Sequence, residues 1–148
     1  MHVLKKLSLF ISLTLLCNNS LFSQNKLPVA SIDSEWNFFQ EVKGIKFYVK
    51  REVKSSMGRL DVDYLIFKLE NTSNKDLDVS YSPVVYYNLG CNGCNSNEFY
   101  RNIVVPAHSS IEGNLSNPNF PVVMLLSNPN LKNGWIPESI ETRNLTVN

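Results

Sequence analysis

Two cysteines three positions apart are the residues of this sequence whose type and spacing most clearly suggest chemistry. Between Cys91 and Cys94 stand Asn92 and Gly93, which adopt positive φ easily and let the chain fold back between the two thiols. We therefore predict a structural disulfide between Cys91 and Cys94. The ring is so small that the chain-entropy model gives this bond only about 2 kcal/mol. Such a disulfide would hold a loop in place rather than stabilise the whole fold.

Two other kinds of site share this spacing. A redox pair of the thioredoxin type needs its first cysteine at the N-terminus of a helix, which lowers the thiol pKa to about 7. Here loop residues follow Cys94, and a strand is predicted from Phe99 onward. A structural zinc needs four ligands, and only His108 or a carboxylate such as Glu98 could complete the set. These sites define an alternative hypothesis, a thiol-redox or metal-binding protein centred on Cys91 and Cys94.

Other candidate catalytic groups are sparse. His108 is the only histidine besides His2, and the adjacent Ser109 and Ser110 would point to opposite faces of a strand. No G-x-S-x-G nucleophile elbow occurs. Two carboxylate pairs each share a strand face and are interpreted as solvated surface: Asp61 with Asp63, and Asp76 with Asp78. We therefore predict no catalytic residue, no metal and no cofactor, and we expect that the protein is not an enzyme.

Aromatic side chains on the solvent side of a strand could bind a partner. Tyr48 and Tyr64 fall on strand faces that also carry lysines, and one of the neighbours Tyr86 and Tyr87 must point away from the core. We expect most other aromatic residues to be core. The candidate surface-binding aromatics are therefore Tyr48, Tyr64, Tyr86 and Tyr87, and their expected partner is a protein or a glycan at the cell envelope.

The N-terminal residues have the order of a secretory signal peptide. Lys5 and Lys6 precede the apolar run 7–16, and a short polar segment follows. This run is too short for a permanent membrane span, which needs about 20 residues. We place the cleavage near Ser23 or Gln24, so residues 1–24 are the expected signal peptide.

Cys17 raises the alternative of a lipoprotein anchor. Lipidation needs a small residue directly before the cysteine, but Leu16 is large, so we expect Cys17 to leave with the signal peptide. Cleavage also removes Lys5 and Lys6, which leaves 12 basic and 13 acidic residues and a net charge of −1. Such a charge argues against a nucleic-acid partner. No second apolar run reaches spanning length, so we expect a periplasmic or extracellular protein in an oxidising compartment.

The elements that position these candidates are predicted to be strands, because apolar and polar residues alternate with period two. Within residues 44–49 the alternation is clean. Residues 61–70 are apolar on both faces in the middle, which indicates a central strand. Residues 77–81 alternate again, and we expect them to form a hairpin with 61–70 across the polar turn 71–74.

Further strands are predicted from the same pattern at residues 36–40, 84–87, 99–105, 109–113, 122–126 and 140–147. Leu145 and Val147 are expected to point inward. Pro83 cannot donate to a sheet, so a bend or an edge is expected there. Residues 88–97 are predicted to be a polar loop that carries both cysteines.

Seven to nine short strands without a convincing helix predict an all-β fold. We expect an antiparallel immunoglobulin-like β-sandwich, with a small closed β-barrel as the alternative. The length fits a single domain over residues 36–148, preceded by a lead-in segment, 25–35, that we expect to be partly mobile.

Four short segments resemble small secreted proteins of Bacteroidetes-type bacteria. The segments are FKLENTSNKDLDVSY, CNGC, EFYRNIVVPAHSSIEG and IETRNLTVN, and the resemblance extends over residues 36–148. It implies an immunoglobulin-like β-sandwich and no particular activity. Members of this group carry a further cysteine just after the Glu-Gly of a capping strand. Here Asn114 and Leu115 follow Glu112 and Gly113, so that extra disulfide is absent from this chain.

Overall fold

The computed structural model describes residues 26–56, 59–95, 97–116, 123–127 and 134–148. The expected signal peptide and its cleavage site lie outside these residues. In chain order the elements are β1 (Leu27–Pro28), the 3-10 helix η1 (Val29–Ser31), β2 (Asn37–Val42), β3 (Ile45–Ser56), β4 (Arg59–Asn71), β5 (Leu77–Tyr87), β6 (Gly90–Asn92), β7 (Arg101–Val105), β8 (Ser110–Glu112), β9 (Val123–Ser127) and β10 (Pro137–Val147).

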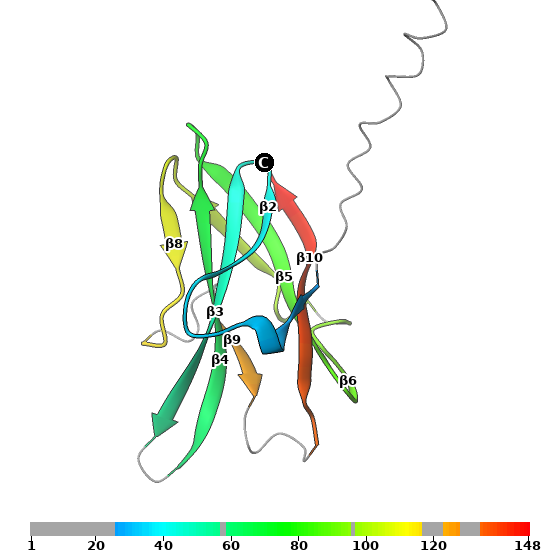
Figure 1. Cartoon of the computed structure of the whole chain (residues 1–148). Helices are drawn as coiled ribbons and strands as arrows, with labels where there is room; N and C mark the ends of the chain where they lie inside the picture. Colours follow the sequence, from blue (N-terminus) through cyan, green and yellow to red (C-terminus); the bar gives the residue numbers. More distant parts are fainter. Residues whose placement is uncertain (1–25, 57–58, 96, 117–122, 128–133) are drawn as a thin grey trace, which may run out of the picture.

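The strands form two antiparallel sheets that pack face to face (Figure 1). The β4 sheet has the order β2-β3-β4, and β8 and β9 share the far edge of β4. The β5 sheet has the order β1-β10-β5, and β6 and β7 share the far edge of β5. Within the described residues no strand pairing joins the two sheets. The predicted β-sandwich is therefore confirmed and the closed alternative is not, although ten strands are described where seven to nine were expected.

The period-two pattern explains which side chains enter the core. The predicted inward residues of β3 and β4 are at most 1% exposed, and they are Ile45, Phe47, Val49, Leu65, Phe67 and Leu69. From β5, Tyr81 packs against two of them, with its ring centroid 5.5 Å from that of Phe47 and 6.4 Å from that of Phe67. The core therefore lies between the sheets, and the alternate residues of β3 and β4 point outward.

The turn between β4 and β5 carries the chain from one sheet to the other. The prediction of a hairpin between residues 61–70 and 77–81 is wrong, because β4 and β5 belong to different sheets. Asn71 holds the turn, since its side-chain amide donates to the carbonyl of Lys75 (2.8 Å) and to that of Val105 in β7 (2.9 Å). The edge of β4 that a hairpin would use is occupied by β8 and β9.

The strand β5 continues through Pro83, where the sequence suggested a bend or an edge. The carbonyl oxygen of Pro83 faces the side of β5 where β6 ends, since a Cβ placed on Gly93 would lie 3.1 Å from it. The N–H and C=O of one strand residue point to the same neighbouring strand. The ring nitrogen of Pro83, which has no hydrogen to donate, therefore faces this side too. Neither β6 nor β7 pairs with residues 82–84, and the proline therefore costs no strand hydrogen bond there.

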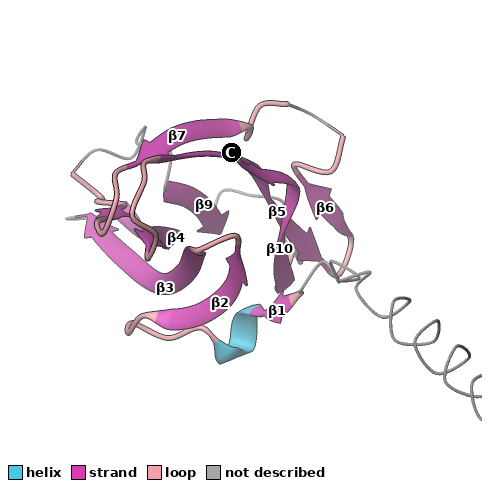
Figure 2. Ribbon diagram, turned by 90° about the horizontal axis from the view of Figure 1, so that it is seen from above, coloured by secondary structure: helices cyan, strands magenta, loops and turns pink. Residues whose placement is uncertain are grey.

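The segment before β2 belongs to the domain, contrary to the expected lead-in over residues 25–35. The strand β1 pairs with β10, and Val29 and Ile32 are buried in the hydrophobic core. Figure 2 shows η1 between β2 and β1, on the side where the edges of the two sheets meet. The domain therefore begins before Trp36, the boundary expected from the sequence.

Polar side chains join the two sheets on the same side. The amide of Gln40 in β2 donates to the hydroxyl of Thr142 in β10 over 2.5 Å, and both residues are buried. The ammonium of Lys43 donates to the carbonyl of Val147 over 2.9 Å. The first contact pairs two polar side chains that would be costly to bury without a partner.

The remaining predicted strands are present with shifted ends, since residues 99–105, 109–113, 122–126 and 140–147 correspond to β7, β8, β9 and β10. Val147 is buried and Leu145 packs against the core, as expected. Residues 88–97 were predicted to be a loop, but this segment contains the strand β6, which pairs with β5.

Candidate functional site

A row of side chains crosses the outer face of the β4 sheet, which is the face turned away from the core. Phe38 of β2 lies opposite Tyr48 of β3, and Tyr48 lies opposite Lys68 of β4. Lys68 in turn lies opposite Glu112 of β8, with Nζ 3.9 Å from Oε1. Residues directly opposite each other in antiparallel strands share a face, so the four side chains stand side by side. Phe38 is 55% exposed, which makes it the most accessible ring of the row.

The members of this row contact one another through aromatic edges and a cation. The ring centroids of Phe38 and Tyr48 are 5.8 Å apart in an edge-to-face arrangement. The Nζ atom of Lys68 is 4.7 Å from the ring centroid of Tyr48 and 5.1 Å from that of Trp36. We call Trp36, Phe38, Tyr48 and Lys68 the aromatic face.

A short loop holds Trp36 on this face. The carboxylate of Asp33 accepts hydrogen bonds from the backbone of Glu35 (2.8 Å) and from the amide of Asn37 (3.1 Å), and these bonds lower the pKa of Asp33. The carbonyl of Asp33 also accepts from the N–H of Arg51 in β3 (2.6 Å). Figure 1 shows the chain from η1 crossing in front of β3 before it enters β2. The loop is therefore anchored at both ends.

A polar hollow of about 680 Å³ borders the aromatic face at Lys68. Its lining includes Lys68, Glu70, Thr72, His108, Ser109 and Ser110. Backbone hydrogen bonds fix its walls, since the N–H of Asn71 donates to Ser109 (2.8 Å) and that of His108 donates to Ser73 (3.2 Å). The walls of the hollow are therefore joined by backbone hydrogen bonds, and several side chains that line it can donate or accept hydrogen bonds.

Tyr48 connects the aromatic face to the hollow. Its pKa is raised, first by partial burial and then by a hydrogen bond with Glu70 and the negative charge of that residue. The hydroxyl of Tyr48 therefore lies against a carboxylate that lines the hollow.

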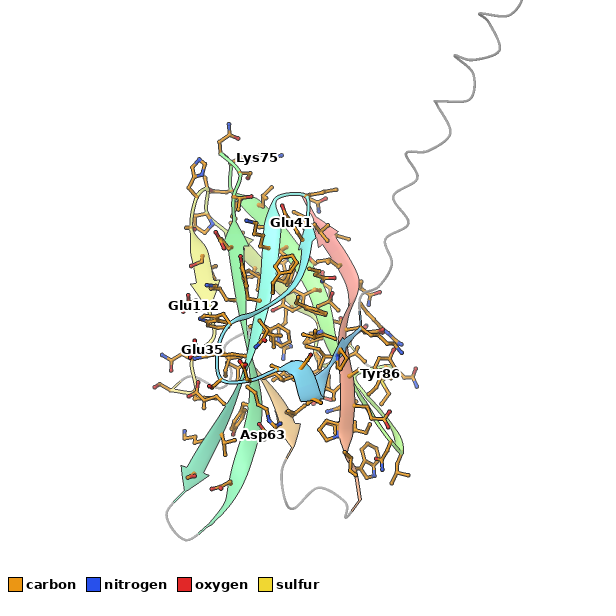
Figure 3. All side chains as sticks on the ribbon, in the orientation of Figure 1. Glu35, Glu41, Asp63, Lys75, Tyr86 and Glu112 are labelled. Atoms are coloured by element: carbon orange, nitrogen blue, oxygen red, sulfur yellow. A yellow bond between two sulfur atoms is a disulfide. The ribbon has the colours of Figure 1, made fainter. Side chains whose placement is uncertain are left out.

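The four predicted surface aromatics do not form one site. Tyr48 belongs to the aromatic face, and Tyr64, half-buried, lies further along the same sheet opposite Leu125. Tyr86 lies on the other sheet, and Figure 3 shows it on the side of the molecule away from Glu112.

Tyr87 is the member of the Tyr86 and Tyr87 pair that points into the core. It is only 6% exposed, its ring centroid is 5.3 Å from that of Trp135, and its hydroxyl donates to the carbonyl of Leu126 over 2.7 Å. Since neighbouring strand residues alternate between faces, Tyr86 takes the outward position and Tyr87 the inward one.

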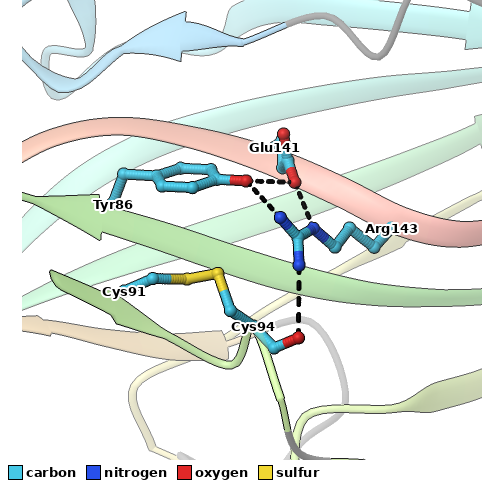
Figure 4. Close-up of a disulfide and its surroundings, with 5 residues drawn as sticks. All are labelled: Tyr86, Cys91, Cys94, Glu141 and Arg143. Carbon is cyan, nitrogen blue, oxygen red and sulfur yellow. Dashed lines mark hydrogen bonds and ion pairs between the residues drawn. A yellow bond between two sulfur atoms is a disulfide. The ribbon is translucent and has the colours of Figure 1, made fainter.

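The predicted disulfide joins Cys91 and Cys94, whose Cα atoms are 5.8 Å apart (Figure 4). Cys91 lies in β6 directly opposite Tyr86. Gly93 has φ +89°, and a Cβ at this position would lie 3.0 Å from the ring of Phe99. Glycine is therefore required for the chain to turn back this closely against the sheet.

A hydrogen-bond network fastens the disulfide loop to β10 (Figure 4). The hydroxyl of Tyr86 donates to the carboxylate of Glu141 (2.6 Å) and accepts from Arg143 (2.5 Å). The guanidinium of Arg143 also pairs with Glu141 and donates to the carbonyl of Cys94 (3.2 Å). Lys26 lies 3.8 Å from the ring centroid of Tyr86. The mutual pairing of these groups identifies a structural latch.

Glu141 gives this latch a pH dependence. Glu141 is 2% exposed, and burial alone would raise the pKa of its carboxyl group. Hydrogen bonds from Tyr86 and Arg143 lower this pKa below the ordinary 4.5. The ionised carboxylate therefore stabilises the fold fully above pH 4.5, and this contribution is lost as the pH falls through the lowered value. We expect Glu141→Gln to destabilise the protein at pH 7, with a difference from wild type that shrinks in acid.

Urea unfolding of both proteins over a series of pH values measures this difference. Glu138→Gln, an exposed carboxylate of the same strand, is the matched control. A wild-type advantage over Glu141→Gln that stays constant into acid would contradict the role of the carboxylate.

The disulfide is expected to stabilise its own loop more than the whole domain. Replacing both Cys91 and Cys94 with serine is expected to lower the free energy of unfolding by no more than about 2 kcal/mol, because the closed ring is small. Urea unfolding measures the global effect, and faster amide exchange in residues 93–99 would report the released loop. Complete loss of folding in the double variant would instead make the bond essential to the whole domain.

The carboxylate pairs differ from the solvated surface that was expected. Asp63 is buried, and one of its oxygens accepts two hydrogen bonds from Arg51, at 2.8 and 2.5 Å, which raise the pKa of Arg51. Asp61 is exposed, as predicted. Asp76 accepts from a backbone N–H over 2.9 Å, and Asp78 is exposed. The solvated interpretation is therefore wrong for Asp63, whose ion pair faces the inner side of the β4 sheet.

His108 is exposed in a turn, with φ +52°. Within the described part of the chain, no three His, Cys, Asp or Glu side chains lie close enough together to hold a metal ion.

Two members of the aromatic face, Trp36 and Phe38, were not among the candidate surface aromatics and belonged to the group of which most were expected to be core. A usable signal was present, because adjacent Phe38 and Phe39 cannot both face inward from one strand. Phe39 is buried and Phe38 is exposed. The sequence also contains a weak signal for the latch, because Glu141 and Arg143 carry opposite charges and stand two positions apart.

Comparison of the chain with protein-family models, with curated proteins and with solved structures gave no match. The resemblance to small secreted proteins therefore stays a prediction. In the residues that the structure describes, no helix has the length and apolar character needed to cross a membrane.

Proposed function

We propose that this protein is an exported, non-enzymatic β-sandwich domain that binds another envelope or secreted component through the aromatic face. The observation that carries the proposal is the row of Phe38, Tyr48 and Lys68 across an exposed sheet. Export is inferred from the signal-peptide pattern of residues 1–24.

The chemistry of the row supports binding. Aromatic rings supply a large apolar area with few rotatable bonds, so they lose little conformational entropy when a partner covers them. Phe38 is exposed, while Trp36 and Tyr48 are held in place by neighbouring lysine and aromatic groups. A ring that is already positioned binds at a lower entropic cost than a mobile one.

The alternative function, thiol-redox or metal binding at Cys91 and Cys94, has less support. The two cysteines are bonded to each other, and the described residues between Cys94 and β7, which are 95 and 97–100, contain turns and no helix. Neither feature resembles the helix N-terminus that activates a redox cysteine.

The first test measures how much purified protein sediments with isolated envelopes of the producing cells. The second measures whether components of concentrated culture medium shift the band of the protein on a native gel. Phe38→Ala is expected to weaken the binding by about tenfold or more. Tyr48→Ala should weaken it similarly.

Tyr100→Ala is the matched control, because Tyr100 is 46% exposed but precedes β7 of the other sheet. It should bind as the wild type does. Binding that is absent in both fractions, or is equally strong in Phe38→Ala, would contradict the proposal.

A further inference from the structure

We infer that the component recognised by the aromatic face is an uncharged polysaccharide chain of the cell envelope. This inference rests on the proposed function and names the ligand class for the same surface. It is carried by the juxtaposition of exposed Phe38, the row Tyr48 and Lys68, and the polar hollow of about 680 Å³ beside them.

The hollow suits a ligand that both donates and accepts hydrogen bonds at many points. Glu70 offers acceptors, Lys68 offers donors, and the hydroxyl of Ser110 can do either. The hydroxyl of Thr72 donates to the carbonyl of Gly44 over 3.0 Å and can still accept. The side chains of His108 and Ser110 are exposed, so a ligand can reach them. Sugar hydroxyls have this mixed character, whereas a lipid tail or an apolar peptide does not.

The charges around the hollow are balanced. Lys68 lies 3.9 Å from Glu112, and Lys46 lies directly opposite Glu70 and Glu41 on the neighbouring strands. A site for an anionic chain would present cations without nearby carboxylates. The balance therefore favours an uncharged ligand.

The aromatic face adds the apolar contact that a sugar ring uses. The C–H groups on one side of a pyranose form a flat apolar patch that stacks on an aromatic ring, and Phe38 presents its ring to solvent. Trp36 and Tyr48 are only partly exposed, so the free apolar area is concentrated on one side chain.

The distance across the site favours a chain rather than a single sugar. Phe38 and Lys68 lie two strands apart, and neighbouring strands are separated by about 4.8 Å, so the two side chains are roughly 10 Å apart. An oligosaccharide can stack on Phe38 and reach the hollow at the same time.

The test uses isolated envelopes of the producing cells, divided into portions treated with periodate or with proteinase K. Periodate cleaves the bond between vicinal hydroxyl-bearing carbons of sugars, and each such carbon becomes an aldehyde while iodate is formed. Borohydride then reduces the aldehydes, so that they cannot react with lysines. Envelopes treated with periodate already quenched by ethylene glycol are the control.

The wild-type protein should lose about tenfold or more of its binding to periodate-treated envelopes and should keep its binding after proteinase K. Phe38→Ala should bind weakly to every portion, and Tyr100→Ala should behave as the wild type. Binding should persist when the ionic strength is raised from about 0.1 M to 1 M, since screening weakens contacts between exposed charges.

Failure of the ligand class can be told apart from failure of the surface. Binding that depends on Phe38 but is abolished by proteinase K, or by salt, overturns the uncharged polysaccharide and leaves the aromatic face as the binding surface. Phe38-dependent binding confined to culture medium overturns the envelope as its source. Binding that does not depend on Phe38 in any portion overturns both proposals.

Discussion

Replacing Tyr81 with alanine is expected to lower the free energy of unfolding by about 4 kcal/mol. The residue is fully buried between the sheets, where its ring contacts Phe47 and Phe67 of the opposite sheet edge to face or at a tilt. Removing the ring leaves a cavity that the rigid strands on either side cannot close. Burial also raises the pKa of the Tyr81 hydroxyl, as expected for a phenol removed from water.

Urea unfolding at neutral pH measures this loss, with Tyr81→Phe as a second variant that keeps the ring. Tyr81→Phe should be much closer in stability to the wild type than Tyr81→Ala. The exposed Tyr100→Ala should change stability by no more than about 0.5 kcal/mol. An equal loss of unfolding free energy in Tyr81→Ala and Tyr100→Ala would contradict the role of Tyr81 in packing the two sheets against each other.

Replacing Asn71 with alanine is expected to lower the free energy of unfolding by about 4 kcal/mol, since a net hydrogen bond contributes about 1 kcal/mol and four would be lost. The side-chain NH₂ of Asn71 donates to the backbone carbonyls of Lys75 and Val105. Its side-chain oxygen accepts from the backbone N–H (2.9 Å) and the hydroxyl (2.7 Å) of Ser73. The residue is 1% exposed, so water cannot replace these partners in the folded protein.

Asn74→Ala is the matched control, because Asn74 lies in the same turn but is exposed. It should leave the urea midpoint nearly unchanged, whereas Asn71→Ala should shift it strongly. Similar midpoints for the two variants would show that the turn does not depend on the Asn71 side chain.

The faces of individual strands could be predicted from the sequence because alternation is a local property. Ile45, Phe47 and Val49 lie inward as expected, and the doubly apolar strand 61–70 is paired on both sides. Pairing between distant segments is not local. The polar turn after residue 70 would suit a hairpin equally well. Its tie to the other sheet includes the bond from Asn71 to Val105, 34 residues away, which local alternation does not reveal.

The candidate site was predicted only in part for the same reason. The cysteine spacing was sufficient to predict a local disulfide, and Tyr48 was recognised from its strand face. The latch depends on register, since Tyr86 and Glu141 are 55 residues apart in the chain. The place of Trp36 depends on the loop held by Asp33, which has no signature in strand periodicity.

The most direct measurement is photo-crosslinking in the producing cells, with p-benzoylphenylalanine in place of Phe38. Benzophenone inserts into C–H bonds of proteins and of sugars, so the measurement does not assume the chemistry of the partner. The same amino acid in place of Tyr100, on the other sheet, is the control. We expect a crosslinked product from position 38 and none from position 100. Equal crosslinking at both positions, or none at position 38 in protein that is exported and folded, would contradict binding through the aromatic face.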